Sequence, residues 1–266
     1  MHCRAPAVRV LVLAALVALF GTLVMPSAQA QQPGAPTAVP VAGVPTVGPL
    51  FLFTTLLPHF CSASVIASPH ADLIVTAAHC VAGTEAGIQF VPGYDNGAAP
   101  FGVWTVRQAY VDPSWIARQD PRHDYAILQV DHQQRGGRWV GVQDVVGANV
   151  LGLAPQPGTT VSVDGYLFGL NDRPLSCTGP VSQTVGYPTF DCQGMAAGTS
   201  GGPWLIHTVL PQLTFTVGVV GGLHQGGCTD STSYTSPFTW DVYALWLRAV
   251  FGAPSDVVPF PACGDC

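Results

Sequence analysis

Short apolar runs separated by turns recur along this chain, and they limit the folds open to it. Runs such as Leu73-Ile74-Val75 and residues 159–163 are rich in β-branched side chains, and 30 glycines and 24 prolines punctuate them. Strands at such close spacing favour a β-barrel or sandwich over a parallel α/β fold. Only residues 241–250 have apolar side chains at helical spacing, with Gly252 just beyond them. The sequence therefore predicts an all-β domain with one C-terminal helix.

The N-terminal residues 1–30 have the pattern of an export signal. Arg4 and Arg9 precede an apolar run over 10–24, and Ala28-Gln29-Ala30 matches a small-x-small cleavage site. The run is short for a membrane span, and no later stretch is long and apolar enough to cross a bilayer. We expect a secreted, extracellular protein with no membrane association once the signal is removed.

Three further regions follow the signal. Residues 31–46 are rich in proline and lack hydrophobic periodicity, which predicts an extended, poorly ordered leader or short pro-segment. The folded domain is expected over 47–252. A tail over 253–266 carries Cys263 and Cys266.

The composition excludes some partners and indicates an oxidising compartment. Charged residues make up 9% of the chain, none is lysine, and the formal net charge is −6, which argues against binding to nucleic acid. Eight cysteines behind an export signal imply disulfides rather than a metal site. Cys3 leaves with the signal, so an odd number remains and either one thiol is free or the assumed cleavage is mistaken.

Three motifs supply the groups that acyl transfer needs. Ser200 lies in Gly198-Thr199-Ser200-Gly201-Gly202-Pro203, where glycines allow the backbone to approach a substrate carbonyl closely. His79 ends a buried strand in Thr76-Ala77-Ala78-His79-Cys80, and Asp124 heads the strand-like run Tyr125–Val130. Each motif alone has a structural explanation, such as a turn or a core histidine. Together they provide a base, an orienting carboxylate and a nucleophile.

With "TAAHC", "DYAIL" and "GTSGGP" in that chain order, the sequence resembles the chymotrypsin/trypsin-like serine peptidase family. The resemblance implies two six-stranded antiparallel β-barrels and a C-terminal helix. It implies that His79, Asp124 and Ser200 form a catalytic triad, with an oxyanion hole made by the N–H groups of Gly198 and Ser200. No cofactor and no metal are required. The expected partner is a protein or peptide substrate, cleaved by a monomeric serine endopeptidase.

The departures from the family pattern place the chain among its bacterial members. Vertebrate digestive members carry aspartate immediately before the catalytic serine, where it binds a new N-terminus after activation, but Thr199 occupies that position here. The start of the domain, Val47-Gly48-Pro49-Leu50-Phe51, is more similar to secreted bacterial glutamyl endopeptidases. The histidine that those enzymes use near the substrate carboxylate is expected at Val220, so glutamate specificity is not supported.

The disulfide pattern is only partly determined by the sequence. The resemblance implies Cys61–Cys80, which would brace the histidine loop. Cys177–Cys192 is expected across a hairpin, leaving Cys228 for Cys263 or Cys266. The alternative joins Cys192 to Cys228, as many family members do.

The expected substrate pocket contains no acidic residue. Its lining leads into the serine loop and follows a later strand: Met195, Ala196, Ala197, Val220, Gly221 and Gly222. Because a buried Arg or Lys would lack a counter-charge there, we expect cleavage after uncharged residues of medium or large size. A preference for Arg or Lys would mean that Asp191 or Asp230 reaches the pocket. No role is assigned to the other histidines: His59, His70, His123, His132, His207 and His224.

Two other functions remain open at this point. A catalytically inactive binding module on this fold would be expected to have lost a triad residue. An acyl esterase would share the chemistry, and Gly198–Gly202 fits the G-x-S-x-G pattern of α/β-hydrolases. The chain order His79, Asp124, Ser200 and the lack of alternating helices argue against an α/β-hydrolase.

Overall fold

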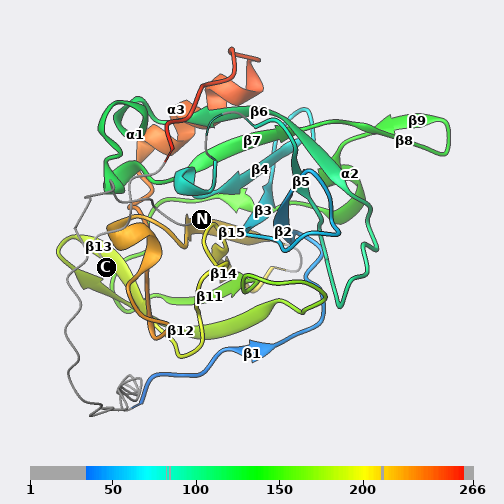
Figure 1. Ribbon diagram of the computed structural model, residues 1–266. Helices are drawn as coiled ribbons and strands as arrows, with labels where there is room; N and C mark the ends of the chain where they lie inside the picture. The colour runs from blue at the N-terminus through cyan, green and yellow to red at the C-terminus, as the bar shows by residue number, and fades with distance from the viewer. Residues whose placement is uncertain (1–33, 82, 84, 211–212, 261–266) are drawn as a thin grey trace, which may run out of the picture.

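The computed structural model describes residues 34–81, 83, 85–210 and 213–260 (Figure 1). The expected export signal over 1–30, and Cys263 and Cys266 in the expected tail, lie outside the described residues. Within the described part of the chain, no helix combines the length and hydropathy needed to span a bilayer.

Six antiparallel strands close into a barrel in the first half of the chain. Their order around the barrel is β2-β3-β4-β7-β6-β5, with bounds β2 (Val47–Leu52), β3 (Cys61–Ile66), β4 (Leu73–Thr76), β5 (Ile88–Phe90), β6 (Trp104–Val111) and β7 (Ala126–Val130). Strands β3, β4 and β7 are buried along their whole length, so they lack the alternation of buried and exposed residues that marks a half-exposed strand. Closure leaves this barrel with no free edge.

An eight-stranded sheet forms the second half of the molecule. Its main path is β10-β15-β14-β11-β12-β13-β16, and β1 (Val39–Pro40) pairs with β12. The bounds are β10 (Val150–Leu151), β11 (Thr160–Gly165), β12 (Leu175–Thr184), β13 (Tyr187–Asp191), β14 (Pro203–His207), β15 (Thr214–Val219) and β16 (Thr232–Tyr234). The predicted fold class is confirmed, while this half has more strands than the six expected because the two-residue strands β1 and β10 join it.

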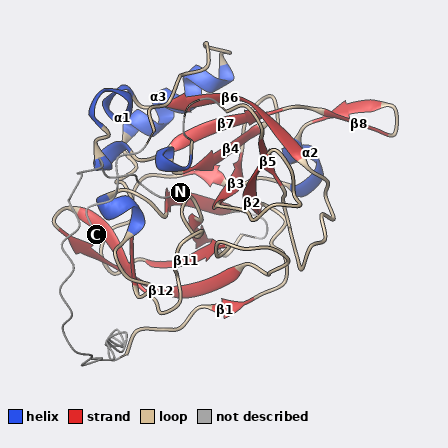
Figure 2. Cartoon of the chain, in the orientation of Figure 1, coloured by secondary structure: helices blue, strands red, loops and turns tan. Residues whose placement is uncertain are grey.

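The α-helices are few and lie around the first barrel (Figure 2). The predicted C-terminal helix is α3 (Trp240–Val250), which Thr239 caps by accepting a hydrogen bond from Asp241 N. Two helices that the sequence did not predict are short, α1 (Pro113–Arg118) and α2 (Val142–Val146). A two-stranded hairpin, β8 (Gln133–Arg135) and β9 (Arg138–Val140), projects from the barrel.

The described part of the proline-rich segment before the first barrel is paired with the second half of the molecule. Ala38 N donates to Gln193 O at 2.9 Å, and Gln193 N donates to Pro36 O at 2.8 Å. Strand β1 then pairs with β12. This edge offers the backbone partners that the sequence pattern of 31–46 does not reveal.

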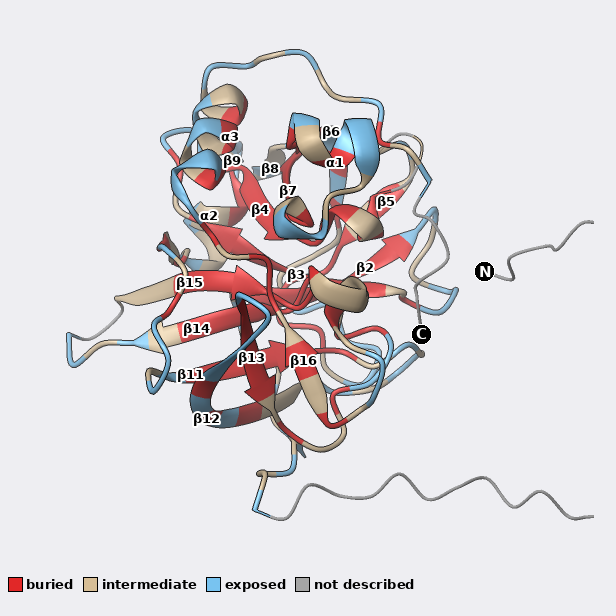
Figure 3. Ribbon diagram, turned by 90° about the vertical axis from the view of Figure 1, so that its left-hand side faces the viewer, coloured by how far each residue is buried: buried red, intermediate tan, exposed pale blue. Residues whose placement is uncertain are grey.

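Buried residues are concentrated in the strands of both halves (Figure 3). The halves touch through β3, which contacts β11 and β14. At this contact Ser62 N donates to Ser200 O at 2.7 Å. A Cβ at Gly201 would overlap Thr76 Oγ1 and Ser62 O, so glycine permits the close approach of the two halves.

Candidate active site

His79 is held at the end of a barrel strand. Strand β4 pairs with both β3 and β7, and the chain then enters the 3₁₀ turn η1 (Ala78–Cys80). A disulfide between Cys61 and Cys80 ties this turn back to β3. Only 9% of the His79 side chain is exposed, so the imidazole has few orientations open to it.

Asp124 fixes the histidine ring and is fixed in turn by backbone donors. Its Oδ2 lies 2.7 Å from His79 Nδ1, and its Oδ1 accepts from His79 N at 2.9 Å. Oδ2 also accepts from Gly222 N at 2.8 Å. Because the carboxylate accepts, the proton is on Nδ1 and the Nε2 lone pair is available as a base. Burial raises the pKa of the adjacent Tyr125 far above its usual range, so this phenol adds no charge beside Asp124.

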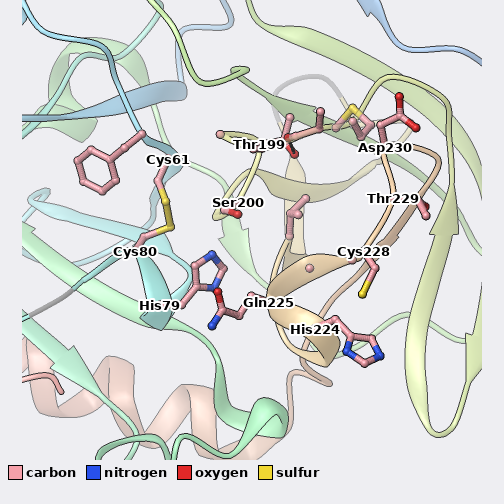
Figure 4. Close-up of a pocket in the computed structure, with 18 residues that line it drawn as sticks. Cys61, His79, Cys80, Thr199, Ser200, His224, Gln225, Cys228, Thr229 and Asp230 are labelled. Carbon is pink, nitrogen blue, oxygen red and sulfur yellow. Dashed lines mark hydrogen bonds between the residues drawn. A yellow bond between two sulfur atoms is a disulfide. The ribbon is translucent and has the colours of Figure 1, made fainter. Parts of the chain in front are cut away.

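Ser200 comes from the second half of the molecule and faces the same pocket as His79 (Figure 4). Its loop is pinned by Gly201 N donating to Val220 O at 2.7 Å and by the contact with Ser62. In the described structure Ser200 Oγ makes no hydrogen bond to His79. Such bonds are commonly long before substrate binds and tighten in the complex.

The serine loop also presents unused backbone donors. Among the described residues, neither the Gly198 N–H nor the Ser200 N–H has an acceptor. The intervening Thr199 turns inward and bonds within its own loop, with its Oγ1 donating to Ala196 O at 2.8 Å. Two free N–H groups flanking a serine hydroxyl are what a tetrahedral oxyanion requires.

A pocket of about 640 Å³ opens beside Ser200. Of the expected lining residues, Met195, Ala196, Ala197 and Val220 do line it. Gly221 and Gly222 do not. Gly222 supports Asp124 instead, and a Cβ at Gly221 would crowd the Asp124 carboxylate at 3.1 Å.

Apart from Asp230, the opposite wall of the pocket was missed by sequence reasoning. This wall begins within η3 (Leu223–Gly226) and runs from His224 to Asp230. His224 and Gln225 both adopt positive φ, at 51° and 53°, between glycines that share such values. The doublet Gly226-Gly227 was the available signal, because consecutive glycines indicate backbone that approaches another group closely.

The cysteines of the site are oxidised. Cys61–Cys80 and Cys177–Cys192 both form, with Cα–Cα distances of 6.1 and 6.6 Å. Because Cys192 is bonded to Cys177, the alternative Cys192–Cys228 bond does not form. Cys228 is also disulfide-bonded, and its partner lies outside the described residues. The sulfurs of Cys61 and Cys80 lie close to the His79 ring, but as a disulfide they offer no thiolate to a metal ion.

A family model described as a trypsin-like peptidase domain matches residues 61–208. A search of curated proteins found no significant match.

Several solved structures share the fold. The protease Anisep from Arthrobacter nicotinovorans is 24% identical with a TM-score of 0.66, covering 81% of this chain and 100% of that one. The thermostable serine protease AL20 from an extremophilic microorganism is 26% identical with a TM-score of 0.63, covering 78% and 98%. A Glu endopeptidase in complex with MPD is 17% identical with a TM-score of 0.59, covering 81% and 98%.

The matched stretch takes in more than half of the chain and contains all three motifs on which the site is built. The chain therefore belongs to the trypsin-like peptidase family.

Proposed function

We propose that this protein is a secreted serine endopeptidase that cleaves peptide bonds through a Ser200, His79, Asp124 triad. The observation that carries the proposal is the arrangement around the pocket. A histidine held by a buried carboxylate and a serine between two free N–H groups both line it. Family membership and the disulfides of the site agree with an enzyme that works outside the cell.

Each residue has a defined part in the reaction. His79 Nε2 removes the Ser200 hydroxyl proton as Oγ attacks the substrate carbonyl, and it returns that proton to the leaving amine. Asp124 keeps the ring in the required tautomer and stabilises the imidazolium. The N–H groups of Gly198 and Ser200 receive the oxyanion, and water then hydrolyses the acyl-enzyme by the same route in reverse.

A fluorophosphonate probe tests the nucleophile directly. Wild-type protein should be labelled, and Ser200→Ala should lose both labelling and about a millionfold of kcat for a peptide substrate. Ser182→Ala, which alters an exposed serine on β12, serves as the matched control and should retain both. A folded wild type that is not labelled would contradict the proposal in favour of an inactive binding module. Labelling with cleavage of esters but not of internal peptide bonds would indicate an esterase.

A further inference from the structure

His59 is a buried histidine that the triad does not use. It has no exposed surface and is enclosed by the rings of Phe51, Tyr94 and Tyr166, each within 6.0 Å between centroids. Its Nε2 lies 2.7 Å from Asp172 Oδ1. Burying a polar side chain among aromatic rings costs free energy unless its hydrogen bond is made. The contact with His59 therefore holds the Asp172 side chain in place.

Asp172 ends a loop, Leu167–Asp172, that His59 holds at two points. Besides the side-chain contact, His59 N donates to Gly169 O at 2.9 Å, and Gly169 N donates back to His59 O at 3.4 Å. The loop belongs to the second half of the molecule, whereas His59 immediately precedes β3 of the first barrel. The pair therefore fixes the loop to the barrel that carries His79.

The same loop holds the peptide that carries an oxyanion donor. Phe168 N donates to Ala197 O at 2.7 Å. Gly198, with φ of +98°, packs so closely on the loop that a Cβ there would overlap Phe168 N and Leu167 C. The peptide bond between Ala197 and Gly198 is trans and planar, so its N–H points away from its C=O. Fixing Ala197 O toward the loop thus directs the Gly198 N–H to the opposite side.

A second contact fixes the following peptide. Tyr166 N donates to Ser62 Oγ at 2.9 Å, and Ser62 Oγ donates to Gly198 O at 3.0 Å. The hydrogen bonds of Thr199 go to Ala196 and Gly202, both within the serine loop, so Thr199 provides no external support. The external hydrogen bonds on the two carbonyls that flank the Gly198 N–H thus come from Phe168 and Ser62.

We propose that His59 and Asp172 are a positioning pair for the oxyanion hole, acting through the loop Leu167–Asp172 on the peptide between Ala197 and Gly198. The kinetic effect of this pair rests on the proposed function. The mechanical coupling between the loop and the Gly198 N–H is independent of that function. Neither residue touches substrate, so the pair acts on the transition state, where the oxyanion forms, more than on substrate binding.

The charged groups around the pair offer a matched control. The loop is followed by Arg173, whose Nε lies 2.9 Å from Asp95 Oδ1. The Arg173 side chain is 51% exposed and the Asp95 side chain is 28% exposed. Asp95, Tyr94 and Tyr166 are the other titratable groups described on this side of His59, and burial raises the pKa of Tyr166. Arg173→Ala therefore removes an ion pair next to the loop without touching the contact to His59.

The test compares three variants of the pair with that control. Asp172→Ala alters a side chain that is 29% exposed, and His59→Phe keeps the aromatic packing while removing the hydrogen bond. Both should lower kcat about 10-fold to 100-fold with little change in KM, and should weaken binding of a peptide aldehyde, whose adduct carries the oxyanion, by a similar factor. His59→Gln retains a donor for Asp172 and should recover most of the loss. Arg173→Ala should behave as wild type.

Amide hydrogen exchange tests the mechanical coupling between the loop and the Gly198 N–H separately from the kinetic effect. In Asp172→Ala and His59→Phe, exchange should accelerate in residues 166–170 and 195–200 and remain at wild-type rates in β7. Unchanged exchange at 195–200, or a kcat loss no larger than in Arg173→Ala, would overturn the inference. A wild type that neither labels nor cleaves would refute the proposed peptidase, and the exchange result would still decide whether the pair holds the loop.

Discussion

Asp124 illustrates how much of this site is made by backbone rather than by side chains. Two of the three groups that donate hydrogen bonds to its carboxylate are backbone N–H groups, from His79 and Gly222. The backbone N–H of Asp124 itself donates to Ser236 Oγ at 3.0 Å. A sequence motif identifies the carboxylate but not the N–H groups that orient it. Gly222 was expected in the pocket wall because glycine suggests room for a ligand, whereas here it allows the backbone to approach the carboxylate.

Asp230 tests the expectation of an uncharged pocket. The structure places it among the lining residues, at the far end of the pocket from His79 (Figure 4), while Asp191 is absent from the lining and accepts from Thr232 Oγ1 at 2.8 Å. Because the uncharged side chains of Met195, Ala196, Ala197 and Val220 line the pocket together with Ser200, we expect a substrate library to show preference for uncharged residues before the scissile bond. Asp230→Asn should leave that preference unchanged. A preference for Arg or Lys that Asp230→Asn abolishes would contradict the expectation and assign specificity to this carboxylate.

Asp164 gives the fold a pH dependence of its own. This carboxyl group on β11 is 5% exposed, and its Oδ1 has no hydrogen-bond partner among the described residues. Burial raises its pKa, and the Ser176 hydroxyl and His207 only partly oppose that effect. The folded state therefore binds the proton more tightly than the unfolded state. Stability should fall as pH rises from the ordinary value of 3.8 through the raised pKa, and stay lower above it.

The variant Asp164→Asn removes this charge. It should be more stable than wild type at about pH 8, and the difference should shrink as the pH approaches about 4. Urea unfolding at a series of pH values measures both midpoints. A stability difference that does not vary with pH would show that the ionisation of Asp164 does not contribute.

At the scale of elements, long apolar strands and the amphipathic helix could be predicted, and short elements could not. Strand β11 and helix α3 were placed within one or two residues, because a β-branched run marks the strand and the buried face of the helix sets a clear period. Helix α1 has six residues and begins at Pro113 with Asp112 as its cap, too short for any period to emerge. In the wall from His224 to Asp230, His224 and Gln225 adopt positive φ, which non-glycine residues rarely do, so local sequence did not indicate it.

Helix α3 offers two leucines for a controlled test of its packing. Leu245 is 3% exposed and belongs to the core of the first barrel, whereas Leu247 is 44% exposed on the same helix. Leu245→Ala should lower the free energy of unfolding by about 2–5 kcal/mol. Leu247→Ala should change it by less than about 0.5 kcal/mol. Denaturant unfolding with the disulfides intact measures both, and equal effects would contradict the packing of α3 on the barrel.

At the scale of the whole molecule, the first described segment packs on the second sheet, and the last described segment packs on the first barrel (Figure 1). The segment around β1 precedes the first barrel but pairs with the second sheet. Helix α3 follows the second sheet but packs on β6 and β7 of the barrel. The residues after α3 continue this contact, since Asp256 pairs with Arg248 at 2.8 Å and accepts from Val111 N at 2.9 Å.

This crossing of the two ends determines when the first barrel can be completed. Val242, Leu245 and Ala249 are part of its core, yet they leave the ribosome only after every strand of the second sheet. Domains of a nascent chain usually fold in order, N-terminal first. Here the N-terminal barrel lacks core side chains until the whole second sheet has been synthesised. The two halves therefore reach their final packing together, after translation has passed residue 250.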